Sequence, residues 1–431
     1  MKTWVTTVSL FALTAGGAVA GGLDRTGQPI QALFESGGEN GNYAELGFAK
    51  TFVNLDGTGV GIDSYSAIDP SLNVPGGTGY SNVGNDFSSF GAALKLKFTE
   101  KWSGAIIIEN PYGADVSYSG DPMTTELGGT SALAETTSAT FYLRYKFDDN
   151  WSAHGGLRLQ KASGDITLSG RSYGLTEQAA RAAAYQAALA GYPSSVVSKL
   201  AGTASGYSVE LEEDWALGYV LGASYEIPSI AARISLTYNS EIEHEMATTE
   251  SGPTVLVGVD PSTGAPIAVP VYDGESTTKV KTPQSVNLEF RTGIASDTLL
   301  FGSVRWVDWS AFRIDPKNFM EVTGSGLVDL EDTTTYAIGI GRKFTEEWAA
   351  SIAVSYEAAG DDMVSPLAPT TGLWAVAVGA SYDMGNMTIT GGVRHSWLGD
   401  ANAETGTPDT TRAIFESNSG TSVGLRIGYD F

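Results

Sequence analysis

The sequence predicts an all-β protein, a transmembrane antiparallel β-barrel of about fourteen strands with a short N-terminal plug (hatch). The last stretch, residues 421–431, alternates between apolar and polar or small side chains, as a strand does when its two faces meet different solvents. The same alternation recurs from residue 42 onward, and tight turns alternate with long connections. The apolar face of the last strand consists of Val423, Leu425, Ile427, Tyr429 and Phe431.

Composition excludes several classes of protein. The chain has no Cys, so it has neither a disulfide framework nor thiolate chemistry. Only 17% of its residues are charged and its mean hydropathy is −0.04, values that suit barrel strands in which every second residue is polar or small. The net charge of −24 argues against nucleic acid as a partner.

The N-terminus predicts export. Residues 1–20 carry Lys2, an apolar run and an Ala18-Val19-Ala20 cleavage site, the pattern of a signal peptide. Beyond residue 20 we find no apolar run near the ~20 residues that a membrane helix requires. Residues 21–41 could form a disordered leader or a hatch inside the barrel. We favour the hatch, because its apolar side chains are too many for a free tail: Leu23, Ile30, Leu33 and Phe34.

Residues 42–431 supply the barrel. The expected strands span 42–53, 86–99, 101–118, 134–148, 150–168, 208–227, 229–245, 279–295, 296–312, 332–345, 346–360, 370–384, 385–398 and 418–431. Tight turns join every second pair, and Trp102, Trp151 and Trp348 end three of them. Short periplasmic turns, long external loops and interfacial aromatic residues are typical of barrels in a bacterial outer membrane.

The two faces of these strands sort by polarity. A charge facing lipid costs roughly 2–4 kcal/mol at the bilayer midplane, so charged residues are expected to point inward. Lipid-facing residues include Phe141, Leu143, Leu157, Leu159, Ile234, Leu236, Ile338, Ile340, Ile352 and Val354. The expected lumen-facing residues are Arg144, Lys146, His154, Arg158, Gln160, Arg233, Glu289, Arg291, Arg305, Glu357 and Arg394.

Two connections are more apolar than solvated loops. Residues 174–203 include an Ala-rich helical insertion, and residues 246–278 carry short apolar runs among Gly and Pro. They either pack on each other as a lid or expose a groove that captures a hydrophobic ligand. The groove would be formed by Leu189, Tyr192, Val196, Val197, Leu200, Val255, Leu256 and Val257.

Several segments, in this order and spacing, resemble the FadL-type family of outer-membrane transporters for long-chain fatty acids and other hydrophobic compounds. They are 102–105 through 110–114, 215–219 into 236–241, Thr282-Pro283-Gln284, 304–312 and the closing Tyr429-Asp430-Phe431. The resemblance covers nearly the whole mature chain. The hatch, however, is shorter than in many family members and lacks their Asn-Pro-Ala turn.

The resemblance implies a route for the ligand. In the family, ligand is captured between external loops, binds in the lumen and leaves sideways through a kink in the third strand. The matching segment here is Asn110-Pro111-Tyr112-Gly113-Ala114, where Pro cannot donate to the ladder and Gly tolerates unusual dihedral angles. An ordinary bulge is the alternative. Asp24, Arg25 and Gln28 are expected to anchor the hatch to lumen charges.

Arginines are the candidates for holding a ligand carboxylate, because guanidinium pairs with it in a bidentate manner. The candidates are Arg158, Arg291, Arg305 and Arg394. The three histidines (His154, His244 and His395) are scattered without a nucleophile or metal-ligand spacing. We therefore expect no catalytic residues, no metal and no cofactor.

We predict a passive outer-membrane channel that takes up hydrophobic molecules, foremost long-chain fatty acids. The alternatives are a general water-filled porin for small polar solutes and an adhesion or structural barrel. Expected partners are a fatty acid or other lipophile, outer-membrane lipid including lipopolysaccharide, and the barrel-assembly machinery through the C-terminal Phe431. Acidic residues in the loops could bind divalent cations that bridge to lipopolysaccharide.

Overall fold

The structure is a computed structural model that describes residues 23–63, 73–173, 191, 206–260, 262–263, 265–270, 272–406 and 409–431. Its main element is one antiparallel sheet that closes on itself, because the first strand pairs with the last from Tyr43↔Asp430 to Asn54↔Ser419. Seventeen segments build this sheet, and three wall strands consist of two segments each. The wall therefore has fourteen strands, as the sequence predicted.

The wall strands follow one another around the barrel in chain order, and consecutive strands are paired by antiparallel ladders. They are β1 (Tyr43–Asn54), β4 (Phe87–Lys97), β5 (Trp102–Glu109), β6 (Gly113–Ser117), β7 (Ser131–Lys146), β8 (Trp151–Leu168), β9 (Tyr207–Ile227), β10 (Ala232–Asn239), β11 (Ile242–Ser251), β14 (Asp273–Thr282), β15 (Ser285–Ala295), β16 (Thr298–Val307), β17 (Thr333–Lys343), β18 (Trp348–Glu357), β20 (Leu373–Asp383), β21 (Met387–Leu398) and β24 (Ser419–Asp430). The split strands are β5/β6, β10/β11 and β14/β15.

Two of these divisions were not foreseen. The strands predicted over 229–245 and 279–295 break at Ser240–Glu241 and at Pro283–Gln284, where Pro283 lacks the N–H that a ladder needs. The strand predicted over 296–312 ends at Val307 and continues as η6 (Trp309–Ala311). Both breaks lie about midway along the strand that they divide.

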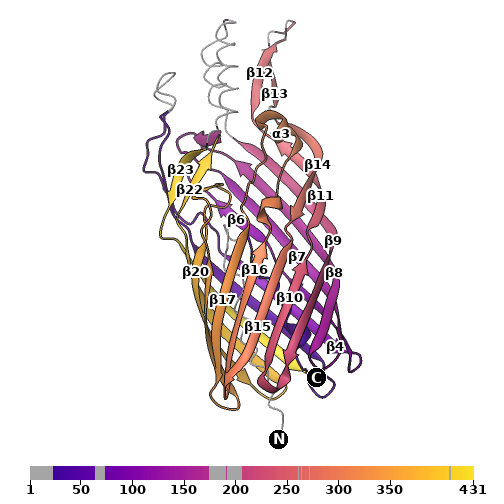
Figure 1. The fold of residues 1–431 in the computed structure, drawn as a ribbon. Helices are drawn as coiled ribbons and strands as arrows, with labels where there is room; N and C mark the ends of the chain where they lie inside the picture. The colour runs from indigo at the N-terminus through magenta and orange to yellow at the C-terminus, as the bar shows by residue number, and fades with distance from the viewer. Residues whose placement is uncertain are drawn as a thin grey trace.

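The connections opposite the tight turns carry structure of their own. A small sheet there contains β2 (Gly57–Gly59), β3 (Gly79–Tyr80), β19 (Met363–Val364), β22 (Ala401–Thr405) and β23 (Thr410–Phe415). Within 246–278, a hairpin of β12 (Thr254–Val259) and β13 (Pro266–Pro270) stands above the barrel rim (Figure 1). The short helices are η2 (Gln31–Phe34), η4 (Arg171–Tyr173), η5 (Pro228–Ile230) and α3 (Lys317–Thr323). The segment 246–278, predicted as a loop, thus includes the ends of two wall strands and a hairpin.

The tight turns gather at the end of the barrel that holds the C-terminus, which is the periplasmic end (Figure 1). Their side chains fix the turn locally. In the turn after β7, Asp148 Oδ1 accepts the backbone N–H groups of Trp151 and Asn150 at 2.7 and 2.8 Å. These two bonds lower the pKa of the Asp148 carboxyl. The next strand starts directly at Trp151 as a result.

The barrel exterior carries an apolar belt that is flanked above and below by a girdle of exposed aromatic residues. Trp151 and Trp348 are exposed at the tight-turn end, and Trp215, Trp374 and Trp397 at the other. The belt covers residues 348–356 in β18 and 215–225 in β9, which fits the ~9–11 residues of a transmembrane strand. Leu157 and Ile338 face outward in it, whereas Arg158 and Gln160 are buried inside. The predicted assignment of these faces is confirmed.

Beyond the belt the strands exchange the polarity of their faces. The outer face there carries ion pairs such as Lys161–Glu213 and Lys279–Glu243, at 2.8 and 2.7 Å. The inner face is apolar and belongs to the largest hydrophobic cluster, to which Ile166, Val209 and Met246 contribute. The upper barrel is therefore packed like a water-soluble domain, and the belt marks the bilayer. No helix in the described part of the chain is long and apolar enough to cross a membrane.

Candidate functional site

The third wall strand is interrupted between β5 and β6 at Asn110–Tyr112. On the β7 side, Glu109 pairs with Ser138 and Gly113 pairs with Glu135. Three residues of the third strand thus oppose two residues of β7, so the interruption is an insertion of a single residue. Pro111 lies at its centre, where it removes one ladder donor.

On its other side the interruption leaves a gap in the wall. Ala92↔Ile108 is the pair of β4 and β5 nearest the interruption, so residues 87–91 have a strand partner only in β1. The N–H of Phe90 instead donates to the side-chain Oδ1 of Asn110 at 3.2 Å. Pairing with the third strand returns just before β4, at the isolated bridge Gly84↔Val116.

The kinked segment turns inward and pairs with the hatch. Asp24 and Tyr112 form an antiparallel bridge. The N–H of Arg25 donates to the carbonyl of Pro111 at 2.9 Å, and the N–H of Gly113 donates to the carbonyl of Leu23 at 3.0 Å. The backbone groups that leave the wall therefore find partners inside the barrel, which offsets the cost of breaking the ladder.

Tyr112 fixes the kink from within. Its side chain is buried, its N–H donates to Thr136 Oγ1 at 2.8 Å, and its hydroxyl accepts a hydrogen bond from Gln28 Nε2 at 2.9 Å. Its ring meets the edge of Trp309, with centroids 5.4 Å apart. Tyr112 thereby joins the third strand, the hatch and the connection after β16.

Gly113 is required by the hatch rather than by its own dihedral angles. A Cβ at this position would lie 2.5 Å from Cζ of Arg25. Arg25 in turn lies over the ring of Phe87 at 4.3 Å, on the β4 edge of the gap. The Arg25 side chain therefore extends from the hatch to the gap, where it lies over an aromatic ring and within electrostatic reach of Asp115 and Glu135.

One buried ion pair, and one hydrogen bond to a second ion pair within the wall, anchor the hatch. Asp24 accepts from Arg305 Nε at 2.6 Å, and Arg305 also donates to Asn287 Oδ1 at 2.7 Å. On the other side, Thr26 donates to Glu109 at 2.9 Å, and Glu109 pairs with Arg158 at 3.2 Å. The lower hatch packs its Ile30 to Phe34 segment against strands β1, β4, β5, β7 and β9.

A pocket of about 130 Å³ lies at the gap, between the hatch and the wall. Gly47 and Gly91 face it, and a Cβ on either would approach nothing closer than backbone oxygens at 3.8–3.9 Å. These two glycines therefore leave open space. The lining residues are Thr26, Pro29, Gln31, Glu45, Gly47, Phe48, Ala49, Ser89, Phe90, Gly91, Ala92, Ile107, Ile108, Glu109, Gly424, Leu425 and Arg426.

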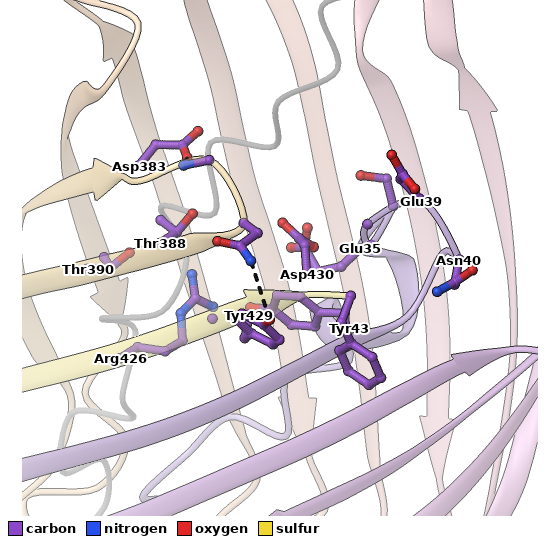
Figure 2. A pocket seen from close by; sticks show the side chains of 17 residues that line it. Glu35, Glu39, Asn40, Tyr43, Asp383, Thr388, Thr390, Arg426, Tyr429 and Asp430 are labelled. Atoms are coloured by element: carbon purple, nitrogen blue, oxygen red, sulfur yellow. Dashed lines mark hydrogen bonds between the residues drawn. The ribbon is translucent and has the colours of Figure 1, made fainter.

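A second pocket, of about 620 Å³, opens at the periplasmic end between the tail of the hatch and β21 and β24. Figure 2 shows carboxylates of Glu35, Asp383 and Asp430 around it, with Arg426 on the wall. Arg426 borders both pockets and lies 3.4 Å from Glu45. The two pockets therefore meet at this ion pair.

The predicted site residues are brought together only in part. The kink and the hatch residues Asp24, Arg25 and Gln28 form one connected site. Among the arginines, Arg158 and Arg305 are neutralised by Glu109 and Asp24, and Arg394 donates to Ser396 Oγ at 3.3 Å. Outside the described residues lie Leu189, Tyr192, Val196, Val197 and Leu200, and the side chains of Val255, Leu256 and Val257.

Sequence reasoning missed Glu109 and Trp309, which hold the site together. Glu109 is the last residue of β5 and lies on the inward parity, so it could have been found as a lumen charge next to the kink. Trp309 follows a strand and enters the lumen only because η6 turns it inward. The alternation of side chains along a strand does not predict this direction.

Together these features define a class, the hatch-plugged transmembrane β-barrel with an opening in its wall. A family model described as outer membrane protein transport protein (OMPP1/FadL/TodX) matches residues 79–431. The chain belongs to this family. It is accordingly an outer-membrane barrel and a channel for hydrophobic compounds.

Solved structures share the fold. A FadL homologue of Pseudomonas aeruginosa is 16% identical, over 97% of this chain and 98% of that one, with a TM-score of 0.67. The toluene transporter TodX of P. putida is 13% identical, over 93% and 92%, with a TM-score of 0.60. The toluene transporter TbuX of Ralstonia pickettii is 13% identical, over 98% and 100%, with a TM-score of 0.57. No curated protein matches the sequence.

Proposed function

We propose that this channel releases hydrophobic cargo sideways into the membrane through the gap between β4 and the third strand. The observation that carries the proposal is the unpaired β4 edge at residues 87–91, with a pocket directly behind it. A sideways exit keeps an apolar molecule in contact with lipid, so it avoids the cost of entering periplasmic water. External loops would capture the cargo, including the groove residues named from the sequence.

Long-chain fatty acids are the first proposed cargo. Their carboxylate would need a free cation, and Arg291 is the candidate arginine that makes no hydrogen bond or ion pair with any described residue. A small aromatic hydrocarbon is the second, and two observations favour it. Arg158 and Arg305 are already paired with carboxylates, and the 130 Å³ pocket approaches the ~150 Å³ cavity that accepts benzene in another protein.

Deletion of Pro111 tests the exit. Because three residues oppose two at the interruption, the deletion restores an even register with β7 and is expected to close the gap. Cells that depend on the variant should take up labelled oleate or toluene at least ~10-fold more slowly, while the protein keeps the heat-modifiable migration of a folded barrel. If only oleate uptake depends on the wild-type protein, the cargo is a fatty acid; if only toluene uptake does, the cargo is an aromatic hydrocarbon. Normal uptake of both by the folded variant would refute the lateral exit.

We further propose the segment boundaries and partners inferred from the sequence. The segments are a signal peptide at 1–20, a hatch at 21–41 and a barrel at 42–431. The barrel-assembly machinery would recognise the C-terminal Phe431, and divalent cations would join the acidic loops to lipopolysaccharide.

A general porin is the competing function, and it predicts a large ohmic conductance in planar bilayers. The hatch contacts support the hydrophobic channel instead.

A further inference from the structure

Two arginines face each other across neighbouring strands near the periplasmic end of the lumen. Arg233 of β10 is the direct register partner of Arg291 of β15. Directly opposed side chains in an antiparallel pair have Cβ atoms only ~4.5–5.5 Å apart, and like charges in this arrangement destabilise a sheet. The pair therefore requires compensation.

Neither guanidinium obtains this compensation from the described part of the protein. Neither donates a hydrogen bond or forms an ion pair there, although Arg233 is only 6% exposed. The Nε of Arg291 is enclosed and has no partner. A buried cation with unused donors is costly, and proteins normally pair it.

The nearby carboxylates are shared or already used. Glu226 is ion-paired with Arg144. Glu289 is within electrostatic reach of both Arg233 and Arg291, but it hydrogen-bonds neither of them. Glu35 of the hatch acts on Arg233 as well as on Lys95. Glu226 and Glu35 thus also serve other cations, and none of the three carboxylates is hydrogen-bonded to Arg233 or Arg291, so both guanidiniums keep unused donors between β10 and β15.

The hatch closes this place from above. Cζ of Arg144 and Cζ of Arg233 lie over the ring of Phe34, at 4.3 and 4.2 Å from its centroid, and the ring meets that of His154 in a T-shaped contact with centroids 5.8 Å apart. This cation-π contact uses none of the N–H donors of Arg233. Arg291 is only partly buried, so an anion can reach the pair.

We propose that Arg233 and Arg291 form a binding site for the oxyanion of a carboxylate or phosphate group at the periplasmic end of the lumen. Guanidiniums bind such groups through parallel N–H···O bonds, and one anion between the two side chains removes their repulsion. The group can come from a soluble anion, including the carboxylate of the fatty-acid cargo proposed above, or from the headgroup of an anionic lipid. The site does not depend on the lateral exit.

The test uses the mature protein in an uncharged maltoside detergent. Thermal unfolding is followed with increasing phosphate or octanoate, with ionic strength held constant by chloride. We expect a saturable rise in Tm of at least ~2 °C with either anion and none with octanol. A rise that occurs only in nanodiscs containing phosphatidylglycerol, relative to phosphatidylcholine, also supports the site and assigns it to a lipid headgroup.

Arg291→Gln separates binding from a merely structural role. Without added anion it should raise Tm, because the like-charge repulsion is gone, and the anion-dependent rise should disappear. Arg342→Gln, at an exposed arginine on β17, is the matched control and should keep the anion response. The proposal would be overturned by a wild type that responds neither to the soluble anions nor to phosphatidylglycerol. It would also be overturned by an unchanged response in Arg291→Gln, or by a lower Tm of that variant in chloride alone.

Discussion

At the scale of single residues, the site depends as much on missing side chains as on those present. Gly47 and Gly91 face the pocket at the gap, and their dihedral angles would accept other residues. The absence of strain means that these glycines are not needed for the fold. Their neighbours Gly113 and Tyr112 differ, because each is held by close contact with the hatch.

Filling the pocket should block transport without unfolding the barrel. Gly91→Phe directs a ring into the ~130 Å³ space, whereas Gly391→Phe adds the same ring on the lipid side of β21, where a Cβ is equally free. We expect Gly91→Phe to slow cargo uptake at least ~10-fold and Gly391→Phe to leave it within ~2-fold of wild type. The rate of cargo uptake is measured in cells that express the two variants at the same level. Equal rates for both variants would show that cargo does not pass through this pocket.

At the scale of elements, the hatch and the third strand form one unit. The strand leaves the wall and gains backbone partners from the hatch, and the hatch is fixed to the opposite wall by Asp24 and Arg305. The kink position was predictable, because Pro111 cannot donate and Gly113 lacks a Cβ. Its inward direction and its pairing with Leu23 and Arg25 were not, since they depend on where the hatch lies.

Removal of one member of the Asp24–Arg305 pair should loosen the hatch. Asp24→Ala leaves a buried guanidinium without its carboxylate, which is expected to cost about 3–5 kcal/mol of hatch stability. Asp24→Ala with Arg305→Met should recover part of this loss, because no lone charge remains. Hydrogen exchange of the hatch amides, measured by mass spectrometry, reports the effect. Equal protection in the wild type and Asp24→Ala would show that this pair does not hold the hatch.

At the scale of the whole molecule, the two faces of the barrel match two environments. Within the belt, apolar residues face lipid and polar residues face the lumen. Above it, charged residues such as Glu243 and Lys279 face water, and the lumen side is apolar. The sequence showed the polarity of the faces within the belt clearly and the reversed polarity above the belt poorly. The reason is that side chains alternate with the same period whichever face is buried.

The level of the bilayer can be tested by placing a charge on either side of the belt boundary. Ile352→Arg puts a guanidinium in the middle of the lipid-facing surface of β18, at an expected cost of about 2–4 kcal/mol. Thr277→Arg puts it on the outer face of β14 above the belt, where the expected cost is below ~1 kcal/mol. Equilibrium unfolding in lipid bilayers with guanidinium chloride measures both, and similar costs would mean that the belt is misplaced.

The sequence alone determined the barrel, its fourteen strands, the orientation of the faces within the belt and the position of the kink, because all of these follow from the residue-by-residue alternation and from the chemistry of proline and glycine. It could not determine which charges are paired. Asp24 and Arg305 are 281 positions apart, and Arg233 and Arg291 meet only through the register of two strands. Such contacts depend on closure of the sheet and on the seating of the hatch, so only the tertiary structure decided which arginines are neutralised and which remain available to an anion.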